Sequence, residues 1–213
     1  MRWRTGRRSS NVEDRRGMRV GMPRGRMGRG VAGGGLGVVV MVVIAMFLGV
    51  DPSIVLQQGG IGAGAPPAHE SGAPPSAAEN ELAEFVSVVL ADTEEVWGEL
   101  FPQKLGKRYQ EPVLVLFEGR VQSACGMADA AVGPFYCPGD QNLYLDLDFF
   151  RELSGRLGAP GDFAQAYVIA HEVGHHVQHQ MGTLAKVQRA KKGLSKKEAN
   201  ALQVRVELQA DCL

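Results

Sequence analysis

The sequence is poor in cysteine and carries no net charge. Its 213 residues include three cysteines, at positions 125, 137 and 212, so it lacks the second close pair of thiolates that a cysteine-based structural zinc site ordinarily uses. Lysine and arginine number 23, as do aspartate and glutamate. No recognisable folded basic module accompanies the arginines, which argues against a nucleic-acid partner.

The charges are unevenly distributed. Residues 1–30 contain ten arginines against Glu13 and Asp14, a net of +8, so the remainder carries −8. The first 30 residues are rich in Gly, Arg and Ser and have few large aliphatic side chains. Such a segment cannot bury a core, and we predict a disordered cytoplasmic arm for residues 1–30.

Residues 31–50 are twenty residues without a charge, long enough to cross a bilayer as one helix. The preceding arginines favour a cytoplasmic N-terminus, which would place the rest of the chain outside. We therefore predict a single-pass protein of the cell membrane with an extracytoplasmic domain. A cleaved signal peptide is the alternative, which the length of the run and the lack of a clear small-x-small cleavage site disfavour.

The remainder divides into a linker and a folded α+β domain. Residues 51–78 are largely Gly, Ala and Pro, typical of a flexible tether, and the domain is placed at 79–213. A capping box at Ser76 to Glu79 starts its first helix. Two strands are predicted at 112–117 and 142–147; in the second, leucines alternate with Tyr144 and Asp146.

Residues 162–182, DFAQAYVIAHEVGHHVQHQMG, contain the pattern HExxH. On a helix with Asp162 as its N-cap, His171 and His175 lie one turn apart on one face, where both imidazoles can bind a single zinc ion. Glu172 is placed to activate the attacking water as general base and to pass its proton to the leaving amine. Gly174 predicts that something packs close to the helix backbone.

A third ligand is expected downstream, because two imidazoles leave zinc short of its usual protein ligands. Glu207 and Asp211 are four residues apart on a second helix, which starts at the capping box Ser195 to Glu198. Antiparallel packing of the two helices would make Glu207 a zinc ligand and Asp211 a hydrogen-bond partner of a ligand imidazole. The alternative is an exposed acidic pair.

Two further histidines belong to the first helix. His176 points away from His175 around the helix, and His179 lies only partly on the ligand face. A metzincin pattern would need glycine at 178, where this sequence has glutamine. We therefore expect His176 and His179 at the surface or behind the ligands.

The chain resembles the bacterial putative neutral zinc metallopeptidases, whose site layout is related to that of the gluzincins. The motifs that carry this resemblance are MRW at 1–3, NVEDRR at 11–16, GVDPS at 49–53, ACG at 124–126, VGPFYCPGDQNLYLDLDFF at 132–150, AHEVGHHVQ at 170–178 and VELQADC at 206–212. The resemblance implies a zincin-like fold with an active-site helix, a second ligand-bearing helix and a small sheet. It makes 142–147 the candidate edge strand for substrate, and it implies a domain that runs on past residue 213.

Together these observations predict a membrane-anchored zinc metallopeptidase that cleaves peptide or protein substrates. Zinc on His171, His175 and Glu207 would polarise the scissile carbonyl, with Glu172 as general base. The alternative is a membrane-tethered zinc-binding adaptor that does not cleave. In an oxidising compartment, Cys125 and Cys137 would close a small disulfide ring; the rival interpretation makes them thiolate ligands.

Overall fold

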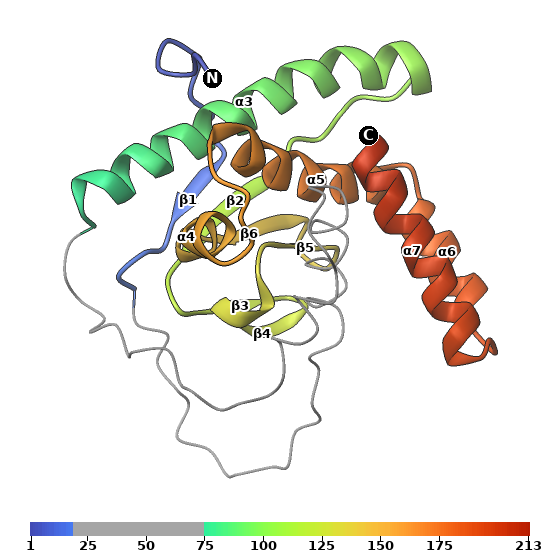
Figure 1. The fold of residues 1–213 in the computed structure, drawn as a ribbon. Helices are drawn as coiled ribbons and strands as arrows, with labels where there is room; N and C mark the ends of the chain where they lie inside the picture. The colour runs from blue at the N-terminus through green and yellow to red at the C-terminus, as the bar shows by residue number, and fades with distance from the viewer. Residues whose placement is uncertain (19–74) are drawn as a thin grey trace.

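The computed structural model describes residues 1–18 and 75–213, which contain a four-stranded sheet with helices on one face. Its strand order is β1–β2–β6–β5, where β1, β2 and β6 run parallel and β5 runs antiparallel to β6. The strands are β1 (Val12–Asp14), β2 (Val113–Phe117), β6 (Asn142–Asp146) and β5 (Phe135–Cys137). Figure 1 shows the long helix α3 (Ala77–Leu105) and helix α5 (Asp162–Gln180) over the sheet.

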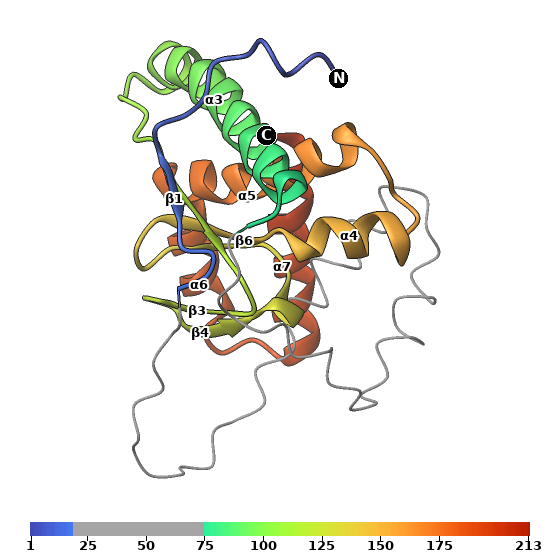
Figure 2. The ribbon, with the colours of Figure 1, turned by 90° about the vertical axis from the view of Figure 1, so that its left-hand side faces the viewer.

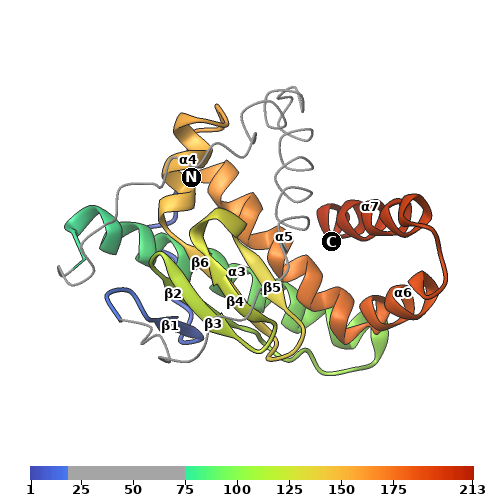
Figure 3. The same ribbon diagram turned by 90° about the horizontal axis from the view of Figure 1, so that it is seen from below.

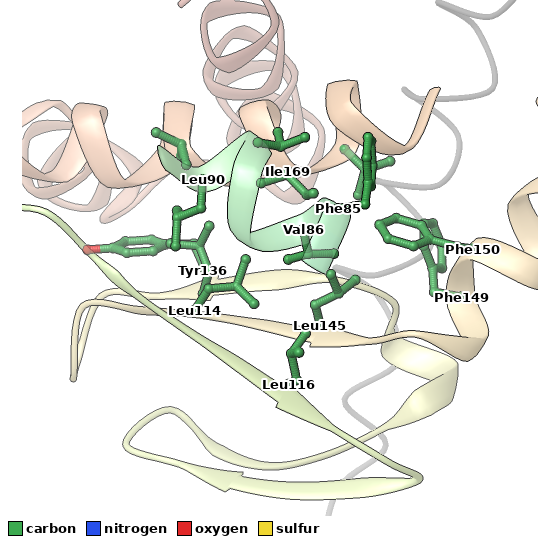
Figure 4. Close-up of a cluster of buried hydrophobic side chains, with 14 of the residues drawn as sticks. Phe85, Val86, Leu90, Leu114, Leu116, Tyr136, Leu145, Phe149, Phe150 and Ile169 are labelled. Carbon is green, nitrogen blue, oxygen red and sulfur yellow. The ribbon is translucent and has the colours of Figure 1, made fainter. Parts of the chain in front are cut away.

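The two central strands are apolar because both faces of the sheet are covered. In β2, Leu114 and Leu116 join the core under the helices, whereas Val115 and Phe117 belong to a second cluster on the opposite face. This is the period-two alternation of a strand. Figure 4 shows the helix-side core, with side chains from α3, α5 and the sheet. The alternation predicted for the strand at 142–147 is present in β6.

The remaining elements surround this core. A two-stranded hairpin lies on the other face of the sheet, and a short 3-10 helix and three α-helices follow or flank the strands (Figures 1 and 3). They are β3 (Arg120–Ser123), β4 (Gly126–Asp129), the short 3-10 helix η1 (Ala130–Val132), α4 (Asp148–Gly155), α6 (Thr183–Lys191) and α7 (Lys196–Cys212). The predicted disulfide is present between Cys125 and Cys137, and it links the end of β5 to the β3–β4 hairpin.

The first 18 residues belong to the domain. Trp3 packs edge-on against Phe85 of α3, with ring centroids 5.4 Å apart, and β1 pairs in parallel with β2 as an edge strand (Figure 2). Behind β1 the carboxylate of Glu94, which is 3% exposed, accepts hydrogen bonds from the side chains of Ser9, Arg7 and Asn11. The disordered arm predicted for residues 1–30 is therefore wrong over residues 1–18.

This pairing also corrects the predicted localisation. A cytoplasmic arm and an extracytoplasmic domain cannot share one sheet, yet β1 is hydrogen-bonded to β2. Within residues 1–18 and 75–213, no helix combines the length and the apolar character needed to cross a membrane. The single-pass membrane topology is therefore wrong. The predicted membrane segment 31–50 itself, and most of the linker predicted at 51–78, lie outside the described residues.

The hydrogen bonds of the buried Glu94 carboxylate predict how much this residue contributes to holding the N-terminal segment on the domain. Glu94→Ala removes the common acceptor of three side chains and should lower the free energy of unfolding by roughly 2–3 kcal/mol, as expected for hydrogen bonds to a charged group. Denaturant unfolding measures this loss. Glu95→Ala, one position along the same helix and exposed, is the matched control and should change stability by less than about 0.5 kcal/mol. Equal effects of the two substitutions would contradict the assignment.

Candidate metal centre

Helix α5 positions the two histidines of the HExxH pattern. Their rings lie with centroids 4.8 Å apart on one face, as one helical turn requires. His171 is buried and His175 is partly exposed. The helix begins differently from expectation: Gly161, at a φ of 99°, occupies the N-cap position, and Asp162 is the first helical residue. The Asp162 carboxylate instead accepts from the Met1 ammonium group at 3.0 Å.

Helix α7 brings a carboxylate to the same point. Glu207, which is 1% exposed, places its Oε2 3.0 Å from Nε2 of His175 and 3.4 Å from Nε2 of His171. Figure 3 shows α7 to one side of α5. Contacts of His171 with Asp211 and of Gln178 with Val206 show that the helices run antiparallel. The structure thus brings together the three residues that the sequence singled out.

The two helices can approach this closely because of one glycine. A Cβ added at Gly174 would lie 2.7 Å from the carbonyl oxygen of Ala210 and 3.1 Å from its Cα. Such distances leave no room for a side chain. This contact, which the sequence predicted without naming a partner, sets the separation of α5 and α7 at the level of the ligands.

The atoms that face one another in this site fit a metal ion. Side-chain atoms of His171, His175 and Glu207 able to bind a metal all lie within 4.8 Å of one another. Among the described residues, five buried side-chain polar atoms lack a hydrogen-bond partner, and they include Nε2 of His171, Oε2 of Glu207 and Oε1 of Glu172. Two imidazole nitrogens and one carboxylate oxygen form a ligand set that zinc takes in catalytic sites, with a fourth position left for water or substrate.

The partners behind the ligands determine which atom of each faces inward. Oδ1 of Asp211 lies 2.8 Å from Nδ1 of His171 and also accepts the hydroxyl of Tyr167. This arrangement places the imidazole proton on Nδ1 and leaves Nε2 for the metal. On α7 the amide of Gln203, itself bonded by Lys191, donates to Oε1 of Glu207, so that Oε2 faces the histidines. The predicted contact of Asp211 is therefore present, whereas Tyr167 and Gln203 were not foreseen.

The charges in the site are strongly coupled. Burial alone would lower the pKa of His171, but the carboxylates of Asp211 and Glu207 outweigh it and raise that pKa to about 10. Burial alone would raise the pKa of Glu207, but the imidazoles of His171 and His175, which face its Oε2, hold that pKa well below its usual range. A metal ion that binds Nε2 of His171 therefore has to compete with a proton for that nitrogen.

Glu172 is set apart from the ligands and turned towards the sheet. Its side chain is 3% exposed, and burial raises its pKa, an effect that the nearby backbone of Tyr136 in β5 partly opposes. A carboxyl group with a raised pKa near the ligands is suited to taking up a proton and releasing it again. The general-base role of Glu172 stays a prediction.

The strand beside α5 is not the one expected. The predicted edge, residues 142–147, forms β6, which is paired on both sides, with β2 and with β5. The edge on this side is β5, Phe135–Cys137. The assignment of 142–147 as the edge, which rested on the resemblance, is therefore wrong; the alternation of leucines could not have corrected it, because it carries no information about which strands lie beside a strand.

The other two histidines connect β5 to α5. The hydroxyl of Tyr136 lies 2.6 Å from Nδ1 of His179 and 3.1 Å from Nδ1 of His176, and Nε2 of His176 lies 2.6 Å from the carbonyl of Gln110. His176 is buried, and neither residue belongs to the ligand group. That these two histidines do not bind the metal stays a prediction.

The comparison with known proteins decides the family. A model of the family described as "Putative neutral zinc metallopeptidase" matches residues 1–213. The chain belongs to this family. Two curated proteins are similar to the chain. "Uncharacterized protein YpfJ" of Escherichia coli K12 is 45% identical over 217 residues, covering 100% of this chain and 72% of the relative. "Uncharacterized protein Rv2575" of Mycobacterium tuberculosis H37Rv is 42% identical over 173 residues, covering 79% and 56%. No solved structure gives a significant match to this member of the neutral zinc metallopeptidases.

The close approach of α5 and α7 predicts that a single methyl group added at Gly174 will weaken zinc binding. In this family member, Gly174→Ala should push α7 outward, separate Glu207 from the histidines and lower zinc affinity by at least about tenfold, as losses of ligand support do. Competition with a chromophoric chelator measures the affinity. Gly98→Ala is the matched control, because a Cβ at Gly98 of α3 meets nothing within 4 Å. It should leave zinc binding unchanged and stabilise the helix by roughly 0.5–1 kcal/mol. Unaltered zinc affinity in Gly174→Ala would contradict the packing argument.

Proposed function

We propose that this chain is a zinc-dependent peptidase that hydrolyses peptide bonds in peptide or protein substrates. One observation carries the proposal: the ligand atoms of His171, His175 and Glu207 converge beside the Glu172 carboxylate, whose Oε1 is buried without a hydrogen bond. A three-ligand set with an open position and an adjacent base is the arrangement of catalytic zinc sites. Membership of a zinc metallopeptidase family supports the same conclusion.

Each side chain has a defined part in this mechanism. His171, His175 and Glu207 would hold the ion, which would supply a Lewis acid for the scissile carbonyl and lower the pKa of water so that a nucleophile forms at neutral pH. Glu172 accepts the proton of the attacking water and delivers it to the leaving amine. Because burial raises its pKa, the carboxyl group gives that proton up less readily than an exposed glutamate and can hold it between the two steps.

The substrate would bind along β5 as an extended strand. Among the described strands, β5 pairs only with β6, and the backbone of Tyr136 in this strand influences the pKa of Glu172 and so lies near its carboxylate. A peptide aligned with the outer side of β5 by main-chain hydrogen bonds would therefore pass next to the general base. Main-chain recognition of this kind favours unstructured peptides or unfolded segments, because a folded protein already pairs its backbone groups.

Replacing the general base tests the proposal without removing the metal. Glu172→Gln should retain one zinc per chain, because Glu172 is outside the ligand group, while peptide cleavage falls by roughly 10²–10⁴-fold, the usual contribution of general acid–base catalysis. Zinc content is measured by elemental analysis, and cleavage by mass spectrometry of an unstructured peptide mixture.

Two controls complete the experiment. Glu207→Gln should lose both zinc and cleavage, and Glu99→Gln, an exposed change on α3, should lose neither. Zinc-loaded native protein that cleaves no peptide would refute the peptidase and favour a zinc-binding protein without hydrolytic activity. Full cleavage by Glu172→Gln would refute the assigned general base.

A further inference from the structure

Gln178 occupies a position between the two ligand-bearing helices. It lies on α5 three residues after His175 and is fully buried. Its Oε1 lies 3.0 Å from Nδ1 of His175, and its Nε2 donates to the backbone carbonyl of Val206 at 2.7 Å and to Oε1 of Gln209 at 3.1 Å. Both ends of one buried amide are therefore engaged, one with a metal ligand on α5 and the other with α7.

The chemistry of these partners fixes which way the amide points. A backbone carbonyl can only accept, so the nitrogen of Gln178 has to face Val206, and the oxygen then faces His175. The oxygen can only accept in turn, so Nδ1 of His175 carries a proton. The unprotonated nitrogen available to a metal is therefore Nε2, the atom that lies 3.0 Å from Oε2 of Glu207.

The same amide acts on a second ligand through the backbone. Val206 directly precedes Glu207, so the bond from Gln178 holds α7 at the residue next to the ligand carboxylate. The close contact between Gly174 and Ala210 restrains α7 about one turn further on. A shift of α7 along its axis would break the bond to Val206 and free the amide that orients His175.

From this geometry we infer that Gln178 is a positioning residue of the zinc site. It sets the tautomer of His175 and places Glu207 at the same time, so that zinc binding depends on an amide that does not touch the metal. This rests on the proposed function only in assuming that the ion held by these ligands is the peptidase's zinc. Partners of this kind typically contribute 10- to 100-fold to metal affinity.

Two substitutions distinguish the contribution of the amide oxygen from that of the amide nitrogen. Gln178→Met is of similar length and forms neither hydrogen bond. Gln178→Glu keeps an oxygen that accepts from Nδ1–H of His175 but loses the donor to Val206 and sets a negative charge against that carbonyl. If Gln178 only filled space and held α7, glutamate would be at least as damaging as methionine. If it orients His175, glutamate should restore part of the zinc affinity.

The decisive experiment measures zinc affinity of the full chain by chelator competition, with Tm of the metal-free protein as a check of folding. Gln178→Met should bind zinc about 10- to 100-fold more weakly than the native chain. Gln178→Glu should fall between the two. Gln209→Met, which changes an exposed partner of the same amide, is the control and should stay within about twofold, because the bond to Val206 remains. Nitrogen NMR of the zinc-loaded native protein should show a proton on Nδ1 of His175.

The possible outcomes separate the inference from the function on which it rests. Native affinity in Gln178→Met, or affinity in Gln178→Glu no better than in Gln178→Met, would overturn the positioning role while leaving the peptidase intact. Absence of zinc binding by the native chain would overturn both. If Gln178→Met does not fold, Gln178→Asn takes its place, because its amide is one methylene too short to reach both partners and should weaken zinc binding in the same way.

Discussion

The close packing of α5 against α7 is the interaction on which the candidate site depends. Two ligands come from α5 and the third from α7, 32 residues after His175 by sequence number, so no local structure can assemble them. The absence of a side chain at Gly174 permits the backbone contact with Ala210. The short distance between the two helices brings the side chains into contact. Glu207 reaches both imidazoles, and Asp211, one turn later, reaches Nδ1 of His171.

Packing α7 against α5 buries charged side chains, and this destabilises the fold unless each buried charge has a partner of opposite charge. Glu207 is buried, and a buried carboxylate without partners would be strongly destabilising. In the metal-free chain the imidazoles of His171 and His175 supply the compensation, and this pairing raises the pKa of His171 and lowers that of Glu207. The remaining polar atoms of the ligands are bonded to partners that do not face the metal. The site is therefore arranged so that a divalent cation can replace protons with little movement of the side chains.

Much of the site could be predicted from sequence because helical periodicity is local. The spacing of His171 and His175, and of Glu207 and Asp211, determines which side chains share a face once the helix exists. Gln178 could not be recognised in this way, since its function depends on the backbone of another helix. Its burial in an otherwise polar stretch is a signal visible only in three dimensions. Sequence patterns suggested that glycine at 174 meets a neighbour, but not that the neighbour is Ala210.

The fold was predictable as α+β, whereas the strand neighbours were not. β1 is short and largely polar at its exposed positions, so its sequence resembles an unstructured arm, and only its pairing with β2 reveals a strand. The edge strand was also misplaced: the resemblance pointed to 142–147, which forms β6, whereas the edge is β5. Strand order depends on contacts between segments far apart in the chain, for which hydrophobic alternation provides no register. The correction of the predicted membrane topology follows from this one pairing.

The central claim, that these two helices form a three-ligand zinc site, is tested most directly by a crystal structure of the zinc-loaded chain recorded at the zinc absorption edge. The account predicts one anomalous peak within about 2.0–2.2 Å of Nε2 of His171, Nε2 of His175 and an oxygen of Glu207, with a fourth position not taken by the protein. A peak elsewhere, or one that Glu207 does not reach, would contradict it.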